Sequence, residues 1–297
     1  MVNTRDYYQP RMIAAARQVL LELAELFKDE RGKIVFVGGT ACALLFPQEN
    51  DLHEGTIDVD IALDTAALAE CGTGTLEEKL LCANYQPDGL KANEAMRPIK
   101  SYRWFRAVSA SEDSPAVEVA IDLLAGEYDD SLRHTNAREI QGLHASVLHG
   151  LDLAFLDPRL VPLASTLPDG TYCKAEVQVC SAASLLAMKG IAIVDRLHGG
   201  DKDAFDIDYI LRRFEGGPDA LARVFQTDIY RHHGLVQEGL AGVAQAFSAL
   251  DAVGPTSIAT ENRYPEPEER AIVQQGAYRR VQALLNLLKI KPAAASG

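Results

Sequence analysis

Hydrophobic and polar residues alternate along this chain with two different periods, which predict helices in some segments and strands in others. Between residues 12 and 27 the apolar residues recur at steps of three and four, the spacing of an amphipathic helix. The segments 57–63 and 117–124 alternate apolar residues with acidic or small ones, the period of two that marks a strand. The β-branched and aromatic run 33–37 predicts a further strand.

The strand at 33–37 ends in a glycine turn that opens into a short helix. Such a turn presents free backbone N–H groups and the positive end of a helix dipole, which suits phosphate oxygens. Gly38 and Gly39 would let a ligand approach the backbone closely, and Thr40 follows them. A glycine pair at this kind of turn is more often a steric requirement, so the turn alone does not assign a site.

Acidic residues share one face of each alternating strand. Asp58 and Asp60 lie one pleat apart, and Asp122 lies on the polar face of the later strand. Carboxylate oxygens are ligands for a hard cation such as Mg²⁺. The alternative is that alternating acids form the solvated face of an edge strand.

Other segments of the first half carry weaker signals. Residues 75–83 favour a helix and 98–110 a strand, whereas 125–160 support no assignment. The basic residues of the second segment favour a solvated strand face over an RNA contact; they are Arg97, Lys100, Arg103 and Arg106.

The pattern becomes helical after a short strand at 175–179. It predicts helices at 181–197, 202–214, 218–231, 235–250 and 265–289, with a loop at 251–264. We therefore expect an α+β protein of two domains: a mixed β-sheet with flanking helices over residues 1–175, and a helical domain over 176–297.

Composition and charge exclude several classes of protein. The chain has 297 residues, is 47% hydrophobic and carries a net charge of −13, which opposes nonspecific binding to polyanions. Its apolar stretches are too short to span a membrane, and its start resembles no secretory signal, so we expect a cytoplasmic protein. The five cysteines show no paired spacing and are expected to be free thiols.

The order of these motifs resembles the nucleotidyltransferase fold shared by DNA polymerase beta, the antibiotic nucleotidyltransferases and the AbiEii-type toxins. The resemblance covers roughly residues 33–124. It implies that the glycine turn holds a nucleoside triphosphate through Gly38, Gly39 and Thr40. It also implies that two Mg²⁺ ions are bound by Asp58, Asp60 and Asp122.

The second half resembles the AbiEii-type toxins, in which a lysine and an arginine on one helix precede an Asp-x-x-Asp segment on the next. Here these are Lys189 and Arg196, followed by Asp203 and Asp206. Lys189 and Arg196 are seven residues apart, two helical turns, so they project the same way. Charges on otherwise apolar faces predict a buried ion-pair network, which is also the purely structural alternative.

These residues predict metal-dependent transfer of a nucleotidyl group from a nucleoside triphosphate to a hydroxyl. Lys189 and Asp206 are expected to join the three aspartates in catalysis, and Lys189 and Arg196 to bind the nucleotide. The resemblance implies an RNA acceptor such as tRNA and a cognate antitoxin as partner. A small-molecule acceptor of the antibiotic type remains an alternative, as does a catalytically silent relative that binds a nucleotide or a protein. Glu54, where those toxins commonly have an arginine, keeps the silent alternative open.

Overall fold

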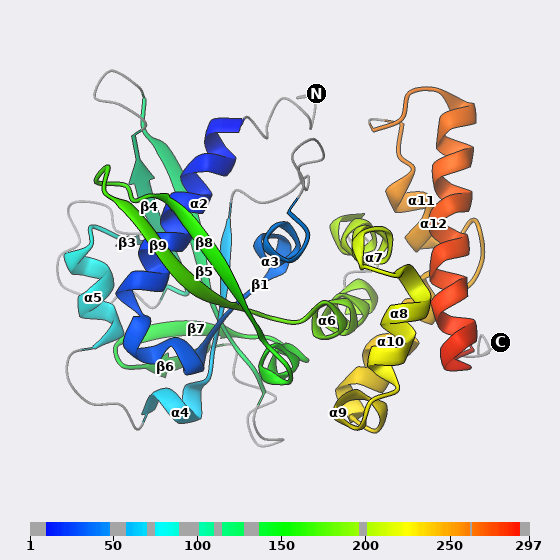
Figure 1. The fold of residues 1–297 in the computed structure, drawn as a ribbon, viewed down its shortest axis with the longest axis horizontal. Helices are drawn as coiled ribbons and strands as arrows, with labels where there is room; N and C mark the ends of the chain where they lie inside the picture. Colours follow the sequence, from blue (N-terminus) through cyan, green and yellow to red (C-terminus); the bar gives the residue numbers. More distant parts are fainter. Residues whose placement is uncertain are drawn as a thin grey trace. The chain divides into compact units, whose positions relative to one another are not determined.

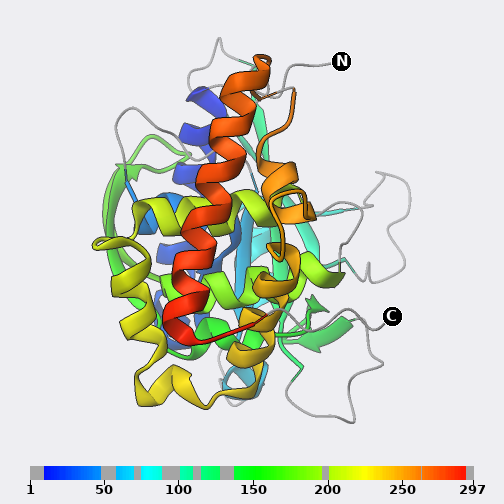
Figure 2. The same ribbon diagram turned by 90° about the vertical axis from the view of Figure 1, so that its right-hand side faces the viewer.

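We describe the protein from a computed structural model. The structure describes residues 10–47, 58–69, 75–88, 101–109, 115–127, 137–195, 201–261 and 263–291. The chain divides into two compact units, of which one extends to Cys180 and the other begins at Ser181 (Figures 1 and 2). Within the described part, no helix is both long and apolar enough to cross a membrane.

A mixed β-sheet forms the centre of the first unit. Its strands are β1 (Ile34–Val37), β2 (Val59–Leu63), β3 (Gln86–Pro87), β4 (Arg103–Val108), β5 (Val117–Ala125), β6 (Ala137–Ile140), β7 (Leu143–Val147), β8 (Arg159–Thr166) and β9 (Tyr172–Val179). They lie in the order β3-β4-β5-β2-β1-β9-β8, while β7 pairs with both β5 and β6. The pairs β1–β9, β2–β5 and β5–β7 are parallel, and the others are antiparallel.

The central strands are buried because helices cover the sheet. All four residues of β1 are buried, as are Val59, Ile61 and Leu63 of β2. Helix α2 (Pro10–Leu26) contacts β9, β5 and β8 and buries its apolar residues there. The other helical segments of this unit are η1 (Lys28–Lys33), α3 (Gly38–Leu45), α4 (Thr65–Ala69), α5 (Leu76–Cys82) and η3 (Leu151–Phe155).

The second unit is helical in its described part. Its helices are α6 (Ala182–Asp195), α7 (Asp201–Arg213), α8 (Gly217–Phe225), α9 (Asp228–Arg231), α10 (Gly234–Ala246), α11 (Val253–Ile258) and α12 (Pro267–Leu288). Helices α6 and α10 pack closely, because a Cβ on Gly239 would overlap the backbone of Ala187 and one on Gly242 would overlap that of Gly190. This contact holds the apolar helix α6 in the interior of the unit.

The expected α+β fold class is confirmed, with corrections to some elements. The predicted strand at 175–179 begins at Tyr172. The predicted helix at 218–231 is two helices, because the backbone at Thr227 is extended. The predicted loop at 251–264 contains α11, whose Pro255 lies in the first turn, where a helix tolerates proline. Four cysteines are free thiols as expected, and Cys71 lies outside the described residues.

Candidate active site

The glycine turn of the predicted site lies between β1 and α3. Helix α3 begins at Gly38 itself, whose φ of +67° is a conformation that favours glycine. A Cβ at this position would also overlap the carboxylate of Asp60. Glycine is therefore required at position 38 both for its backbone conformation and for its lack of a side chain. The absent side chain lets the Asp60 carboxylate lie at the N-terminus of α3. A carboxylate is stabilised there by the helix dipole.

Thr40 links the same turn to the backbone of Asp58. Its buried hydroxyl donates a hydrogen bond to the backbone carbonyl of Asp58 at 3.0 Å. Asp58 directly precedes β2, so this bond fixes the start of that strand against α3. The Thr40 hydroxyl thus has a structural partner, and the phosphate contact expected of Thr40 is left to its backbone.

Strand register brings the third aspartate beside the second. In the parallel pair β2–β5, Asp60 is the direct partner of Asp122. Neighbouring strands lie about 4.8 Å apart, so the two side chains project from adjacent positions on one face of the sheet. Asp122 is buried, whereas Asp60 and Asp58 are half-buried. The structure thus brings together the residues expected from two separate strands.

Arg103, which the sequence analysis assigned to a solvated strand face, lies at the candidate site. In the antiparallel pair β4–β5 it lies opposite Asp122. Its Nε and one terminal nitrogen donate to the two Asp122 oxygens, each at 2.6 Å. These hydrogen bonds raise the pKa of Arg103 against the opposing effect of burial, and the charges of Asp122 and Asp58 raise it further. Arg103 therefore interacts electrostatically with two of the three predicted metal ligands.

The other basic residue in the described part of β4, Arg106, also forms an ion pair. It donates to both carboxylate oxygens of Glu22 in α2, at 3.0 and 3.1 Å. This ion pair fastens α2 to the sheet. The expected solvated strand face is therefore wrong for Arg106, whose side chain is only 16% exposed. Arg97 and Lys100 lie outside the described residues, as does Glu54.

The donor chemistry of the three aspartates fits Mg²⁺, which binds hard oxygen ligands. Arg103 uses one lone pair on each oxygen of Asp122, and a carboxylate has about four such acceptor positions. Asp122 therefore keeps acceptor positions that the arginine does not use. Within the described ranges, no group of three or more His, Cys, Asp or Glu side chains is arranged to hold a metal ion, so a metal site built from all three aspartates stays a prediction.

The charged residues predicted on the helix pair form a buried cluster in the second unit. Lys189 Nζ lies 2.9 Å from Asp203 Oδ1 and 2.6 Å from Asp206 Oδ2. Both aspartates are fully buried. Burial opposes the charged form of Lys189, but the charges of Asp206 and Asp203 outweigh it and raise the pKa of Lys189 above its usual value. Arg196, expected beside Lys189, lies outside the described residues.

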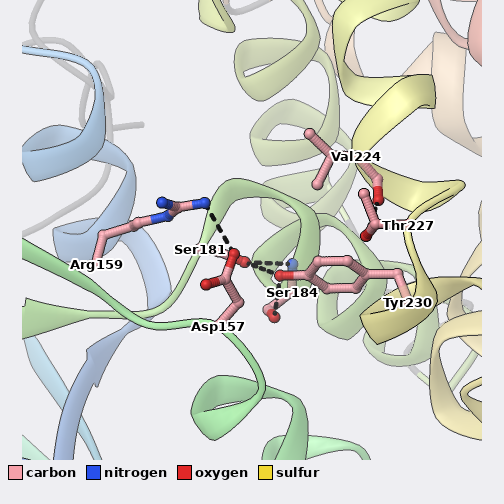
Figure 3. Close-up of polar contacts among 7 residues, drawn as sticks. All are labelled: Asp157, Arg159, Ser181, Ser184, Val224, Thr227 and Tyr230. Atoms are coloured by element: carbon pink, nitrogen blue, oxygen red, sulfur yellow. Dashed lines mark hydrogen bonds and ion pairs between the residues drawn. The ribbon is translucent and has the colours of Figure 1, made fainter.

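A second polar cluster caps the N-terminal end of α6 (Figure 3). Ser181 Oγ accepts a hydrogen bond from the backbone N–H of Ser184 and lies 2.6 Å from the hydroxyl of Tyr230 in α9. All three side chains are buried, so the cluster is an N-cap tied to a neighbouring helix and not an exposed nucleophile. Figure 3 also draws the ion pair of Arg159 with Asp157 in the first unit, at 2.8 Å.

The chain is similar to a protein family and to a few solved structures. The family model described as "Nucleotidyl transferase AbiEii toxin, Type IV TA system" matches residues 22–287. Among solved structures, an antigenic nucleotidyltransferase-like protein from Paracoccidioides brasiliensis is 14% identical, with a TM-score of 0.38 over 85% of this chain and 97% of that one. JHP933 from Helicobacter pylori is 12% identical, with a TM-score of 0.39 over 92% and 94%. No curated protein sequence matches the chain.

Proposed function

Because this chain belongs to the AbiEii family of nucleotidyltransferase toxins, we propose that it transfers a nucleotidyl group from a nucleoside triphosphate to a hydroxyl of RNA, with Mg²⁺ as cofactor. The observation that carries the proposal is the position of Asp60. Its carboxylate lies at the N-terminus of α3 on one side and beside Asp122 on the other. A helix N-terminus that could bind phosphate and two carboxylates therefore lie together at one end of the central strands β1 and β2.

The charges at this end of the strands support a dependence on metal. The N-terminus of α3 favours an anion, but three carboxylates repel a triphosphate at close range. Arg103 is ion-paired with Asp122 and offsets part of the negative charge of this group. A divalent cation between the acids and the phosphates would remove the remaining repulsion.

The proposed reaction is a substitution at the α-phosphorus. A bond forms between the acceptor oxygen and that phosphorus, the bond to the β-phosphate bridge breaks, pyrophosphate leaves, and the hydroxyl proton passes to solvent or to a carboxylate. The start of α3 would bind phosphate oxygens, and Asp58, Asp60 and Asp122 would hold the cations. Bound Mg²⁺ would supply positive charge to the reacting phosphate and lower the pKa of the acceptor hydroxyl.

The toxin family supports RNA as acceptor, with tRNA as the specific candidate. A toxin has to act on a component that every cell contains, which is true of RNA and not of an antibiotic. The same membership supports a cognate antitoxin as partner. The catalytic roles of Lys189 and Asp206 and the nucleotide contacts of Lys189 and Arg196 remain predictions.

Incubation with each labelled nucleoside triphosphate, total RNA and Mg²⁺ tests the proposal. We expect label to enter RNA, with tRNA separated on a gel as the first fraction to inspect. The Asp60→Asn variant and a reaction with excess chelator are the controls, and both should abolish labelling. Label on a small molecule would contradict the RNA acceptor, and no transfer with any nucleotide would contradict the activity.

A further inference from the structure

Arg103 gives the acidic site a cation of its own. Its guanidinium makes two short, charge-assisted bonds to the buried carboxylate of Asp122. Asp58 also acts on it electrostatically, and Asp60 is the register partner of Asp122. A single guanidinium from β4 thus serves a group of carboxylates that comes from β5 and from the start of β2.

The two partners of this ion pair differ in exposure. The Arg103 side chain is 38% exposed and that of Asp122 is 12% exposed. The backbone of Arg103 is held by the β4–β5 ladder and by the Ser101 hydroxyl, so a change of its side-chain rotamer would leave the backbone in place. Because the guanidinium lies on the solvent side, it can leave Asp122 without disturbing the strand.

We propose that Arg103 is a built-in counter-ion that competes with a divalent cation for Asp122. Without metal it offsets the repulsion among the three carboxylates and keeps Asp122 in place. A divalent cation that binds the acids meets an added positive charge and a carboxylate already engaged, so the arginine weakens cation binding. This inference rests on the proposed function, because it requires the aspartates to bind a divalent cation.

Arg106 provides a matched control on the same strand. It makes a bidentate pair of the same kind, but with Glu22 of α2. Removal of either arginine breaks one ion pair of β4, and only Arg103→Gln changes the charge beside Asp122. A structural role for Arg103 would make the two variants behave alike.

The test is a titration of the full chain with Mn²⁺ alone, followed by calorimetry and by electron paramagnetic resonance of the free ion. We expect Arg103→Gln to bind Mn²⁺ about tenfold more tightly than wild type, because a positive charge beside the site has been removed. Arg106→Gln should bind as wild type does. In thermal melts, Mn²⁺ should raise the melting temperature of Arg103→Gln more than that of either other protein.

The outcomes separate the inference from the function on which it rests. Equal or weaker Mn²⁺ binding by Arg103→Gln, beside clear binding by wild type, would overturn the counter-ion proposal and leave the metal site standing. Absence of binding by wild type would overturn the metal site itself.

Arg103→Lys, which keeps the charge and loses the bidentate contact, serves if the glutamine variant does not fold, and should bind Mn²⁺ more tightly than wild type. In an Asp122→Asn background, Arg103→Gln should tighten binding by a smaller factor, and an undiminished factor would contradict competition for Asp122.

Discussion

Gly38 is the most constrained residue of the candidate site, because two independent requirements meet there. Its φ of +67° is unfavourable for any residue with a Cβ, and the Asp60 carboxylate fills the space that a Cβ would take. Gly38→Ala should therefore destabilise the fold and displace Asp60. We expect loss of nucleotidyl transfer together with a fall in unfolding free energy, measured by urea denaturation.

Gly170 separates the two requirements experimentally. Its φ is +86°, yet nothing lies within 4 Å of an added Cβ. Gly170→Ala should therefore cost only the backbone term, about 1–2 kcal/mol, and keep transfer activity. If Gly38→Ala costs no more than Gly170→Ala and remains active, the contact with Asp60 has no role in the site.

The aspartates of the site should respond differently to neutralisation. Asp60→Asn should abolish transfer and change stability by less than about 1 kcal/mol, because lost repulsion among the acids offsets the lost interaction with α3. Asp122→Asn should also abolish transfer, but cost about 1–3 kcal/mol by weakening the Arg103 pair. Labelled-nucleotide transfer and thermal melts measure both effects. The exposed Glu118 of β5 gives the control variant Glu118→Gln, and activity retained by Asp60→Asn would refute the assignment.

Local patterning could predict the acids of the site but not their partner. Asp58 and Asp60 follow from alternation within one strand, and the glycine turn from its own sequence. The contact of Arg103 with Asp122 depends on the register of β4 against β5, a pairing between distant segments. Alternation places Arg103 and Arg106 on opposite faces of one strand, but only tertiary structure shows which carboxylate each of them pairs with.

At the scale of elements, the cluster around Lys189 holds α6 to α7. One lysine serves two buried carboxylates, so removal of Asp203 still leaves Lys189 paired with Asp206. Loss of Asp203 therefore does not leave a buried cation unpaired. Loss of Lys189 should be more damaging, because two buried carboxylates then lie together without their shared cation.

Lys189→Met should consequently be the more damaging substitution. We expect a loss of about 3–5 kcal/mol for Lys189→Met and clearly less for Asp203→Asn, measured by urea unfolding at pH 7. Because the folded pKa of Lys189 is raised, its contribution is complete below the unfolded value of about 10.4 and is lost as pH rises further. The gap between wild type and Lys189→Met should thus stay constant from pH 7 to about 10. Equal losses for the two variants would contradict the shared-cation arrangement.

Whether an element could be predicted from sequence depends on whether local residues or contacts with distant segments stabilise it. Strands β1, β2 and β5 are buried central strands whose apolar residues mark them in the sequence. Segment 125–160 supported no assignment because β6 and β7 form a short hairpin stabilised by pairing with β5, which local sequence does not encode. Helix α11 carries Gly254 and Pro255, which favour a turn unless packing against α7 and α12 decides otherwise.

At the scale of the whole molecule, net charge affects how the proposed RNA acceptor would bind. The chain has a net charge of −13, and three of the described cations of the first unit are already paired. Arg103 is bound to Asp122 and Arg106 to Glu22, while Lys79 of α5 is bound to Glu30. A cation that is already paired in this way displaces fewer counterions from an RNA backbone.

The turnover of RNA should therefore depend only weakly on salt. Each phosphate neutralised on a single strand contributes about −0.7 to the slope of log affinity against log salt. With Mg²⁺ held constant and NaCl varied from about 50 to 200 mM, we expect a slope of log kcat/KM shallower than about −2, which corresponds to fewer than about three phosphate contacts. A free nucleoside as acceptor, which has no phosphate backbone, gives the baseline for salt effects on nucleoside triphosphate binding alone. A slope of about −4 or steeper would show that RNA is held by a cationic surface other than these ion-paired residues, because paired arginines release few counterions.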